Sequence, residues 1–379
     1  MKFDTLAIHA GRSVDPASGA VTTPIHPSTT YERDPDGGFS RGYDYARSNN
    51  PTRESFEHCL AALEGGAGSV AFASGMAATT AVIEAVALAP QARPVVVMPA
   101  DMYFGNLGLV RNTDFASRLQ FHGVDMTDLD TLDTLCRDER PSLVWAETPS
   151  NPRLTVTDLR AIAEIAHRWG ARMVVDNTWA SPALQRPLSF GADGVMHAVT
   201  KYIGGHSDMM AGGVVWGQDD GMLARLRAQQ SYKGAVPSPF DCWLALRGVQ
   251  SLKVRMEAHW RSAQVLAERL DAHRAVVRVH YPGLPSDPGH GIAARQMDGF
   301  GGMLSFVVRG GREAAFTVAN SLSLIIRATS LGGAHSLIEH RASIEGEDSR
   351  APQGLLRLSV GLEDVEDLWA DLEAALDEA

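Results

Sequence analysis

The sequence predicts an α/β fold, in which a mainly parallel sheet is covered by helices on both faces, together with a smaller α+β unit. Two observations predict it. Short, continuous apolar runs of strand length alternate with segments of helical periodicity over residues 50–247. After this stretch, a long amphipathic segment is followed by a mixture of strand-like and helix-like segments, which is typical of an α+β unit.

The first helix is predicted to begin at Asn50-Pro51, because Asn is a good N-cap residue and Pro suits the first helical turn. Gly65-Gly66 ends it. Five apolar strands are expected, at Ser69–Ala73, Pro94–Met98, Ser142–Glu147, Arg172–Asp176 and Gly194–Ala198. Helices are expected between them, from Ser74-Gly75 to about Ala89 and near Asp158–Trp169.

The C-terminal part should contain helices near Ser251–Ala272, Glu313–Asn320 and from about Glu363, and strands at Gly302–Val308 and Leu355–Val360. Residues 1–49 are rich in Gly, Pro, Ser, Thr and Tyr and predict an extended arm. The expected organisation is therefore an arm (1–49), an α/β domain (50–247) and a C-terminal α+β domain (248–379).

The charge and cysteine content narrow the functional class. The 379 residues include 34 Lys+Arg and 45 Asp+Glu, for a net charge of −11, which argues against nucleic-acid binding. Neither a signal peptide nor an apolar run long enough to span a bilayer is evident. The three cysteines lack metal-ligand spacing. We expect a cytoplasmic protein without a metal and with a small-molecule substrate.

Lysine is scarce, since only Lys2, Lys201, Lys233 and Lys253 occur. Lys201 follows a predicted buried strand, and ligands bind at the carboxyl ends of strands in open α/β sheets. A partly desolvated lysine has a lowered pKa and can form a Schiff base. A surface lysine in a glycine-rich loop is the alternative reading.

Three further positions follow predicted strands. Asp176 could hold a proton on a pyridine nitrogen, or could cap the next turn. Ser74-Gly75-Met76 joins a strand to a helix, where backbone N–H groups bind phosphate, although such turns are common. Tyr103 could stack on a planar ring, or could be an ordinary rim residue.

Two arginines complete the set. Arg357 is a lone charge in an apolar strand, so a carboxylate partner is expected, either a protein acid or a substrate. Arg47 lies in the arm and would reach a neighbouring subunit's site. Together these residues are the parts required by a pyridoxal-phosphate (PLP) enzyme that acts on an amino acid.

At this point the sequence resembles the Cys/Met-metabolism (transsulfuration) family of PLP enzymes over nearly its whole length. The motifs that carry the resemblance are YARSNNPT (45–52), ASGMAA (73–78), ETPSNP (147–152), VVDNTWASP (174–182), TKYIGGHSD (200–208), ATSLGGAHSLIEHRASIEG (328–346) and LLRLSVGLEDVEDLWADLE (355–373).

The resemblance implies the type I, aspartate aminotransferase-like PLP fold and a homotetramer built from two catalytic dimers. It implies that Lys201 carries PLP as a Schiff base and moves protons, that Asp176 pairs with the pyridine nitrogen, and that Tyr103 stacks on the ring. Ser74, Gly75, Met76 and Thr200 would hold the phosphate, with Tyr45 and Arg47 from the adjacent subunit. Tyr45 would also be catalytic. Asn151, Ser330 and Arg357 would orient the substrate carboxylate.

The chain also departs from the family pattern. Ala198 stands where the family often has Ser, which removes one phosphate hydroxyl, and Phe104-Gly105-Asn106 replaces the usual Gly-Gly-Thr after the stacking tyrosine. Methionine γ-lyases typically carry a cysteine near Gly105, and bacterial β-lyases often have Trp at Leu331. Thr329 stands where many γ-acting members have Glu. His335 stands where the family usually has Glu.

The expected activity is a cystathionine γ-synthase-like replacement on an O-acylhomoserine with cysteine. Cystathionine γ-lyase or β-lyase activity is the alternative, and a PLP-binding protein with little catalysis is a remote one. A nucleotide-binding dehydrogenase is disfavoured, because no G-x-G-x-x-G follows the first strand.

Overall fold

The computed structural model of the chain describes residues 1–89, 93–346, 349 and 351–379. Within them, seven strands form one sheet in the order β1-β7-β6-β5-β4-β2-β3. Their bounds are Gly68–Phe72 (β1), Gly212–Trp216 (β7), Gly194–Ala198 (β6), Arg172–Asp176 (β5), Leu143–Glu147 (β4), Val95–Pro99 (β2) and Gln120–Val124 (β3). All neighbours pair in parallel except β7, which is antiparallel to both β1 and β6. The prediction of a mainly parallel α/β sheet is therefore confirmed.

Both faces of this sheet are covered, as continuous apolar strands require. Alternate residues of a strand enter different cores: Val96 and Met98 pack into one core, and Val97 packs into the other. The first core includes helix α3 (Gly75–Val86) and residues of α4 (Phe104–Asn112), and the second includes α6 (Leu129–Glu139) and α7 (Leu159–Arg168).

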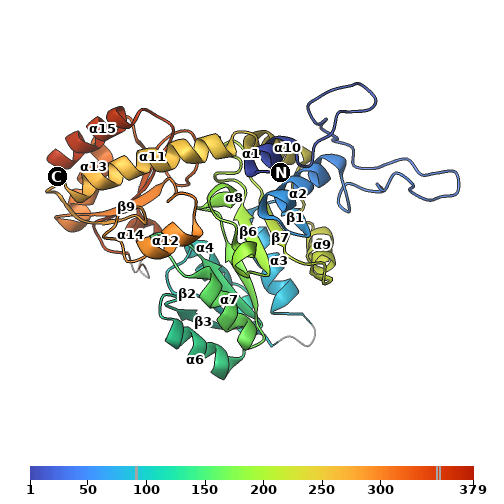
Figure 1. The fold of residues 1–379 in the computed structure, drawn as a ribbon, viewed down its shortest axis with the longest axis horizontal. Coiled ribbons are helices and arrows are strands. Elements are labelled where there is room, and N and C mark those ends of the chain that lie inside the picture. The colour runs from blue at the N-terminus through green and yellow to red at the C-terminus, as the bar shows by residue number, and fades with distance from the viewer. Residues whose placement is uncertain (90–92, 347–348, 350) are drawn as a thin grey trace.

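A second sheet lies in the C-terminal part of the described chain, in the order β10-β11-β12-β9-β8. Its strands are Ile326–Arg327 (β10), Leu337–His340 (β11), Leu355–Ser359 (β12), Met303–Val308 (β9) and Val276–His280 (β8). The long helix α11 (Leu252–Asp271) and α13 (Gly311–Ser321) pack against it, and α15 (Val365–Asp377) packs against these two helices (Figure 1). The remaining helices include α9 (Met222–Lys233), α10 (Pro239–Val249), α12 (His290–Gln296) and α14 (Arg341–Glu345), and the short ones are α5 (Phe115–Arg118), α8 (Ser181–Leu184) and the 3₁₀ turn η1 (Pro187–Phe190).

The start of α2 (Pro51–Glu64) agrees with the prediction. The Asn50 side chain accepts hydrogen bonds from the backbone N–H groups of Thr52 and Arg53, and Gly65 ends the helix in a left-handed conformation. The arm is less uniform than predicted, because it begins with helix α1 (Phe3–His9), whose Ala7 is buried and which packs against α2. Between α1 and α2, long loops project from the rest of the chain (Figure 1).

The structure adjusts other predicted bounds by a few residues. The helix after Ser74 ends at Val86 and not near Ala89, and the terminal helix begins at Val365. The domain division at residue 247 stays a prediction. It lies inside α10, between the last strand of the first sheet and the first strand of the second.

Candidate active site

A cavity of about 410 Å³ lies where the carboxyl ends of β1, β4, β5 and β6 meet residues of the C-terminal sheet. Its lining contains ten of the residues singled out from the sequence: Ser74, Gly75, Met76, Tyr103, Asn151, Asp176, Thr200, Lys201, Ser330 and Arg357. The carboxyl edge of the sheet is the ligand-binding edge in open α/β folds. The topology therefore brings together side chains that are up to 283 residues apart.

Lys201 is partly buried in this cavity, three residues after β6. Its Nζ donates a hydrogen bond to Ser330 Oγ over 2.8 Å. Burial and the nearby Arg357 charge lower the pKa of Lys201 to about 8, although Glu339 opposes the shift. A substantial share of the amine is therefore neutral near physiological pH, as nucleophilic and proton-transfer chemistry require.

Asp176 is the last residue of β5 and lies opposite Glu147, the last residue of β4. Burial raises the pKa of Asp176, whereas hydrogen bonds from Thr178 and the charge of His197 lower it. One of those bonds joins Thr178 N to Asp176 Oδ1 over 3.0 Å. The turn-capping role that the sequence offered as an alternative is thus present, on a carboxylate that also faces the cavity.

Glu147 is a functional candidate that the sequence reasoning missed. Its carboxylate accepts the N–H of Tyr103 at 3.0 and 2.9 Å and the N–H of Asn151 at 3.0 Å. Burial and the Asp176 charge raise the pKa of Glu147 well above its ordinary value. We infer that Asp176 keeps its negative charge and that Glu147 is the member of the pair that takes up a proton. The available signal was the position of Glu147, which ends an apolar strand as Asp176 does.

Arg357 lies in β12 with an almost fully buried side chain. Its Nη1 donates to Asn151 Oδ1 over 3.0 Å, and its Nη2 donates to Glu339 Oε2 over 2.8 Å. The carboxylate partner expected from the sequence is therefore a protein acid, although the guanidinium also lines the cavity. Arg341 shares the same Glu339 oxygen and pairs with Glu345. Neither Glu339 nor Arg341 was singled out from the sequence.

The turn from β1 to α3 supplies a helix N-terminus. Ser74 is the N-cap, and its Oγ accepts the N–H of Ala77. A Cβ built on Gly75 would lie 2.9 Å from the Cβ of Ala198, so a larger residue at Gly75 would crowd this corner of the cavity. The N–H groups of a first helical turn have no partners within the helix, and this end of α3 suits an anionic group.

Tyr103 is 44% exposed and lines the same cavity as Lys201 and Asp176. Tyr45 and Arg47 are not among the described residues of the cavity lining. Arg47 instead donates from Nη1 to Ser231 O over 3.1 Å, and its guanidinium lies over the Tyr45 ring. The predicted action of these two residues in another subunit stays a prediction.

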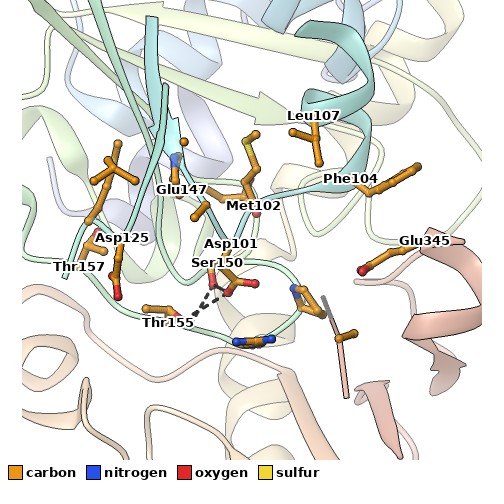
Figure 2. Close-up of a pocket in the computed structure, with 18 of the residues that line it drawn as sticks. Asp101, Met102, Phe104, Leu107, Asp125, Glu147, Ser150, Thr155, Thr157 and Glu345 are labelled. Carbon is orange, nitrogen blue, oxygen red and sulfur yellow. Dashed lines mark hydrogen bonds between the residues drawn. The ribbon is translucent and has the colours of Figure 1, made fainter. Parts of the chain in front are cut away.

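A second cavity of about 330 Å³ is lined by Asp101, Phe104, Ser150 and other residues that lie next to Tyr103 and Asn151 in the sequence (Figure 2). There, Asp101 accepts hydrogen bonds from the hydroxyls of Ser150 and Thr155, and Glu147 lines both cavities. These bonds fix the loop after β4 to the loop after β2. Because these loops also carry Tyr103 and Asn151, the Asp101 hydrogen bonds help to hold both residues in position.

A lysine of lowered pKa, a helix N-terminus, a buried carboxylate and an exposed ring at one sheet edge define a site of the PLP-dependent type. The model of the Cys/Met metabolism PLP-dependent enzyme family matches residues 4–377. The chain belongs to this family, and it is a PLP-dependent enzyme of transsulfuration.

Relatives with different activities are similarly close. Cystathionine γ-synthase of Mycobacterium tuberculosis is 48% identical over 98% of this chain and 96% of its own length. Cystathionine γ-lyase of Dictyostelium discoideum is 45% identical over 99% of this chain and 98% of its own length. Cystathionine β-lyase of Coxiella burnetii is 44% identical over 99% of this chain and 97% of its own length. A crystal structure of cystathionine γ-synthase from Xanthomonas oryzae in complex with cystathionine matches with a TM-score of 0.94 and 43% identity, over 100% of this chain and 98% of the other.

The residues of the first cavity fit PLP. The α3 N-terminus suits its phosphate, Asp176 suits its pyridine nitrogen, and Lys201 suits its aldehyde. No helix in the described part of the chain is long and apolar enough to cross a membrane. The cysteines Cys59, Cys136 and Cys242 are buried, and none is among the described residues of the cavity lining.

Proposed function

We propose that the enzyme carries out γ-replacement, in which an O-acylhomoserine and cysteine form cystathionine. The observation that carries this proposal is Lys201, whose pKa of about 8 and position in the cavity suit repeated proton transfers near neutral pH. Chemistry at Cγ requires a proton to leave Cα and another to leave Cβ, whereas β-elimination requires only the first. A base that both accepts and returns protons suits γ chemistry. Since β-elimination uses such a base as well, the 48% identity to a cystathionine γ-synthase is what favours the replacement reaction.

PLP, when bound, supplies a protonated ring that disperses negative charge developing at Cα. The residues of the chain provide the rest. Lys201 removes and returns protons, and its bond to Ser330 orients the amine. Arg357, with Asn151, binds the substrate carboxylate, since a guanidinium offers paired donors to a carboxylate. Tyr103 would stack on the cofactor ring.

Cystathionine γ-lyase activity is the second candidate, because it uses the same residues without the added thiol. The 45% identity to the Dictyostelium γ-lyase supports it. The β-lyase alternative is less favoured, because Leu331 in the cavity wall stands where bacterial β-lyases often have Trp. A PLP-binding protein with weak catalysis is a remote alternative. It is based on the departures from the family pattern at Ala198, Asn106, Thr329 and His335.

We also propose a homotetramer of two catalytic dimers, in which Tyr45 and Arg47 complete the phosphate site of the adjacent subunit. Their absence from the described lining of the cavity in their own chain is compatible with this arrangement. The exposure of Tyr45, at 47%, leaves its ring available to a second subunit.

The test is to assay the purified holoenzyme with O-succinylhomoserine, O-acetylhomoserine and cystathionine, each with and without cysteine. Cysteine-dependent formation of cystathionine supports the synthase. Release of cysteine from cystathionine identifies the γ-lyase instead, and release of homocysteine identifies the β-lyase. A PLP-loaded protein that is inert towards all three substrates contradicts every proposed activity. Lys201→Ala is the control, and it should abolish turnover.

A further inference from the structure

Asn106 is a buried amide without a partner. It is the third residue of α4, its exposed fraction is 1%, and it lines the cavity that contains Lys201. Neither its Nδ2 nor its Oδ1 has a hydrogen-bond partner among the described residues. Buried amides are nearly always paired, so an unpaired one at a cavity wall indicates that a ligand supplies the partner.

The position of α4 indicates which end of the cavity Asn106 serves. Helix α4 packs against α3, whose first residues Gly75 and Met76 line the same cavity. The methyl group of Ala198 faces Gly75 at this corner and offers no hydrogen bond. Asn106 thus lines the same cavity as the helix N-terminus that suits a phosphate, and its own helix packs against that helix.

The other side chains at this corner have little donor capacity to spare. Thr200 Oγ1 lies 3.3 Å from Ala211 O and accepts the Ala211 N–H at 3.1 Å, so it is engaged with the start of β7. Ser74 Oγ accepts the Ala77 N–H and retains only its own hydroxyl proton. A phosphate monoester offers several strong acceptor positions, and the two Nδ2 protons of Asn106 are free to meet them.

We propose that the side-chain amide of Asn106 donates a hydrogen bond to the phosphate of PLP and replaces the hydroxyl that a serine at position 198 would supply. The inference rests on the placement of the phosphate at the start of α3, and it is independent of the choice between synthase and lyase. In this proposal, two departures of this chain from the family pattern, Asn106 and Ala198, compensate for each other.

The test measures cofactor binding, not turnover. Apo-protein is prepared from the full-length wild type and from Asn106→Ala, and each is titrated with PLP and, separately, with pyridoxal, which lacks the phosphate. Loss of one hydrogen bond to a charged group should weaken PLP binding by about tenfold or more. Pyridoxal affinity should stay unchanged. Ala198→Ser added to Asn106→Ala should restore most of the lost PLP affinity.

Thr157→Val is the matched control, because Thr157 Oγ1 is also buried without a partner among the described residues but does not line this cavity. It should leave PLP affinity unchanged. Thermal unfolding of each apo-protein checks the fold, and Asn106→Leu, which is close to Asn in size, serves if Asn106→Ala unfolds.

Three results would overturn the proposal. Equal loss of PLP and pyridoxal affinity would show a structural role. A raised KM for the amino-acid substrate with unchanged PLP affinity would place the amide at the substrate. If Asn106→Ala left PLP affinity unchanged while Gly75→Ala weakened PLP binding, the proposed hydrogen bond from Asn106 would be wrong, but the phosphate would still lie at the start of α3. If Gly75→Ala were also without effect, the placement of the phosphate would be wrong as well.

Discussion

Glu339 and Arg357 lie directly opposite each other on β11 and β12, and Glu339 Oε2 is 2.8 Å from Arg357 Nη2. The same oxygen also receives Arg341, so one carboxylate separates two buried guanidinium groups. Since all three side chains are at least nine-tenths buried, water screens their charges only weakly. We therefore expect the ion pair to contribute to the stability of the fold as well as to the cavity.

Glu339→Gln should destabilise the protein, because it leaves the two arginine charges without an anion between them. Breaking a buried ion pair by removing one partner costs on the order of 3 kcal/mol, to be measured by urea unfolding of the apo-protein. Glu32→Gln is the matched control, because the Glu32–Arg41 pair is exposed, and little change is expected there. Equal stability of Glu339→Gln and the wild type would contradict this reading.

Lys201 should make the cofactor-free protein less stable at neutral pH. Its pKa falls from 10.5 to about 8 on folding, so the unfolded chain binds more protons between these values, and stability rises with pH through that window. Below pH 8 the penalty is complete and amounts to roughly 3 kcal/mol at most.

Lys201→Met apo-protein should thus be more stable than wild-type apo-protein at pH 7, and the difference should shrink as the pH rises towards 10.5. Urea unfolding across this pH range measures it. Lys253→Met is the control, because Lys253 is a half-buried lysine of α11 that pairs with Glu257. A difference that does not change with pH would attribute the effect to packing.

Asp176 and Glu147 should respond differently to loss of charge. Asp176→Asn removes the anion that we propose to face the pyridine nitrogen and should lower kcat by about a hundredfold or more, while PLP should stay bound through Lys201. Glu147→Gln keeps an oxygen that accepts the N–H groups of Tyr103 and Asn151, so it should retain most of the turnover.

Kinetics and the visible absorbance of the lysine-bound cofactor measure both effects in parallel. If Glu147→Gln lost as much turnover as Asp176→Asn, our assignment of the negative charge to Asp176 would be wrong.

Local patterns in the sequence were sufficient for the central strands, and they failed where strands are exposed or rich in glycine. The predicted β5 and β6 agree with the structure at both ends, because both are short and mainly apolar runs. Strand β3 was missed because it is a half-exposed edge strand, and β7 because it begins with two glycines. The antiparallel direction of β7 depends on its pairing with β1 and β6, which no local pattern reports.

The site shows the same limit. Lys201, Asp176 and the turn at Ser74 could be found because each follows a strand. Glu339 could not, since its importance comes from the pairing of β11 with β12, which sets it opposite Arg357. The unpaired amide of Asn106 likewise depends on how α4 packs against α3.

The arm should act on a neighbouring subunit, and mixed oligomers test this directly. Arg47→Ala and Lys201→Ala should each be almost inactive alone. In a mixed dimer, the site that contains Lys201 receives an intact Arg47 from the other chain, so one of its two sites works. Since half of randomly formed dimers are mixed, refolding the two variants together at equal amounts should restore about a quarter of wild-type activity.

Activity in the mixture that stays at the level of the separate variants would show that Arg47 acts in its own chain, where it already donates a hydrogen bond to Ser231 O. Arg41→Ala mixed with Lys201→Ala is the control. Arg41 lies on the same arm and pairs only with Glu32 among the described ion pairs, so Arg41→Ala alone should be active and mixing should add nothing beyond dilution. The contrast between the two arginines would separate a specific contribution of Arg47 from a general effect of the arm.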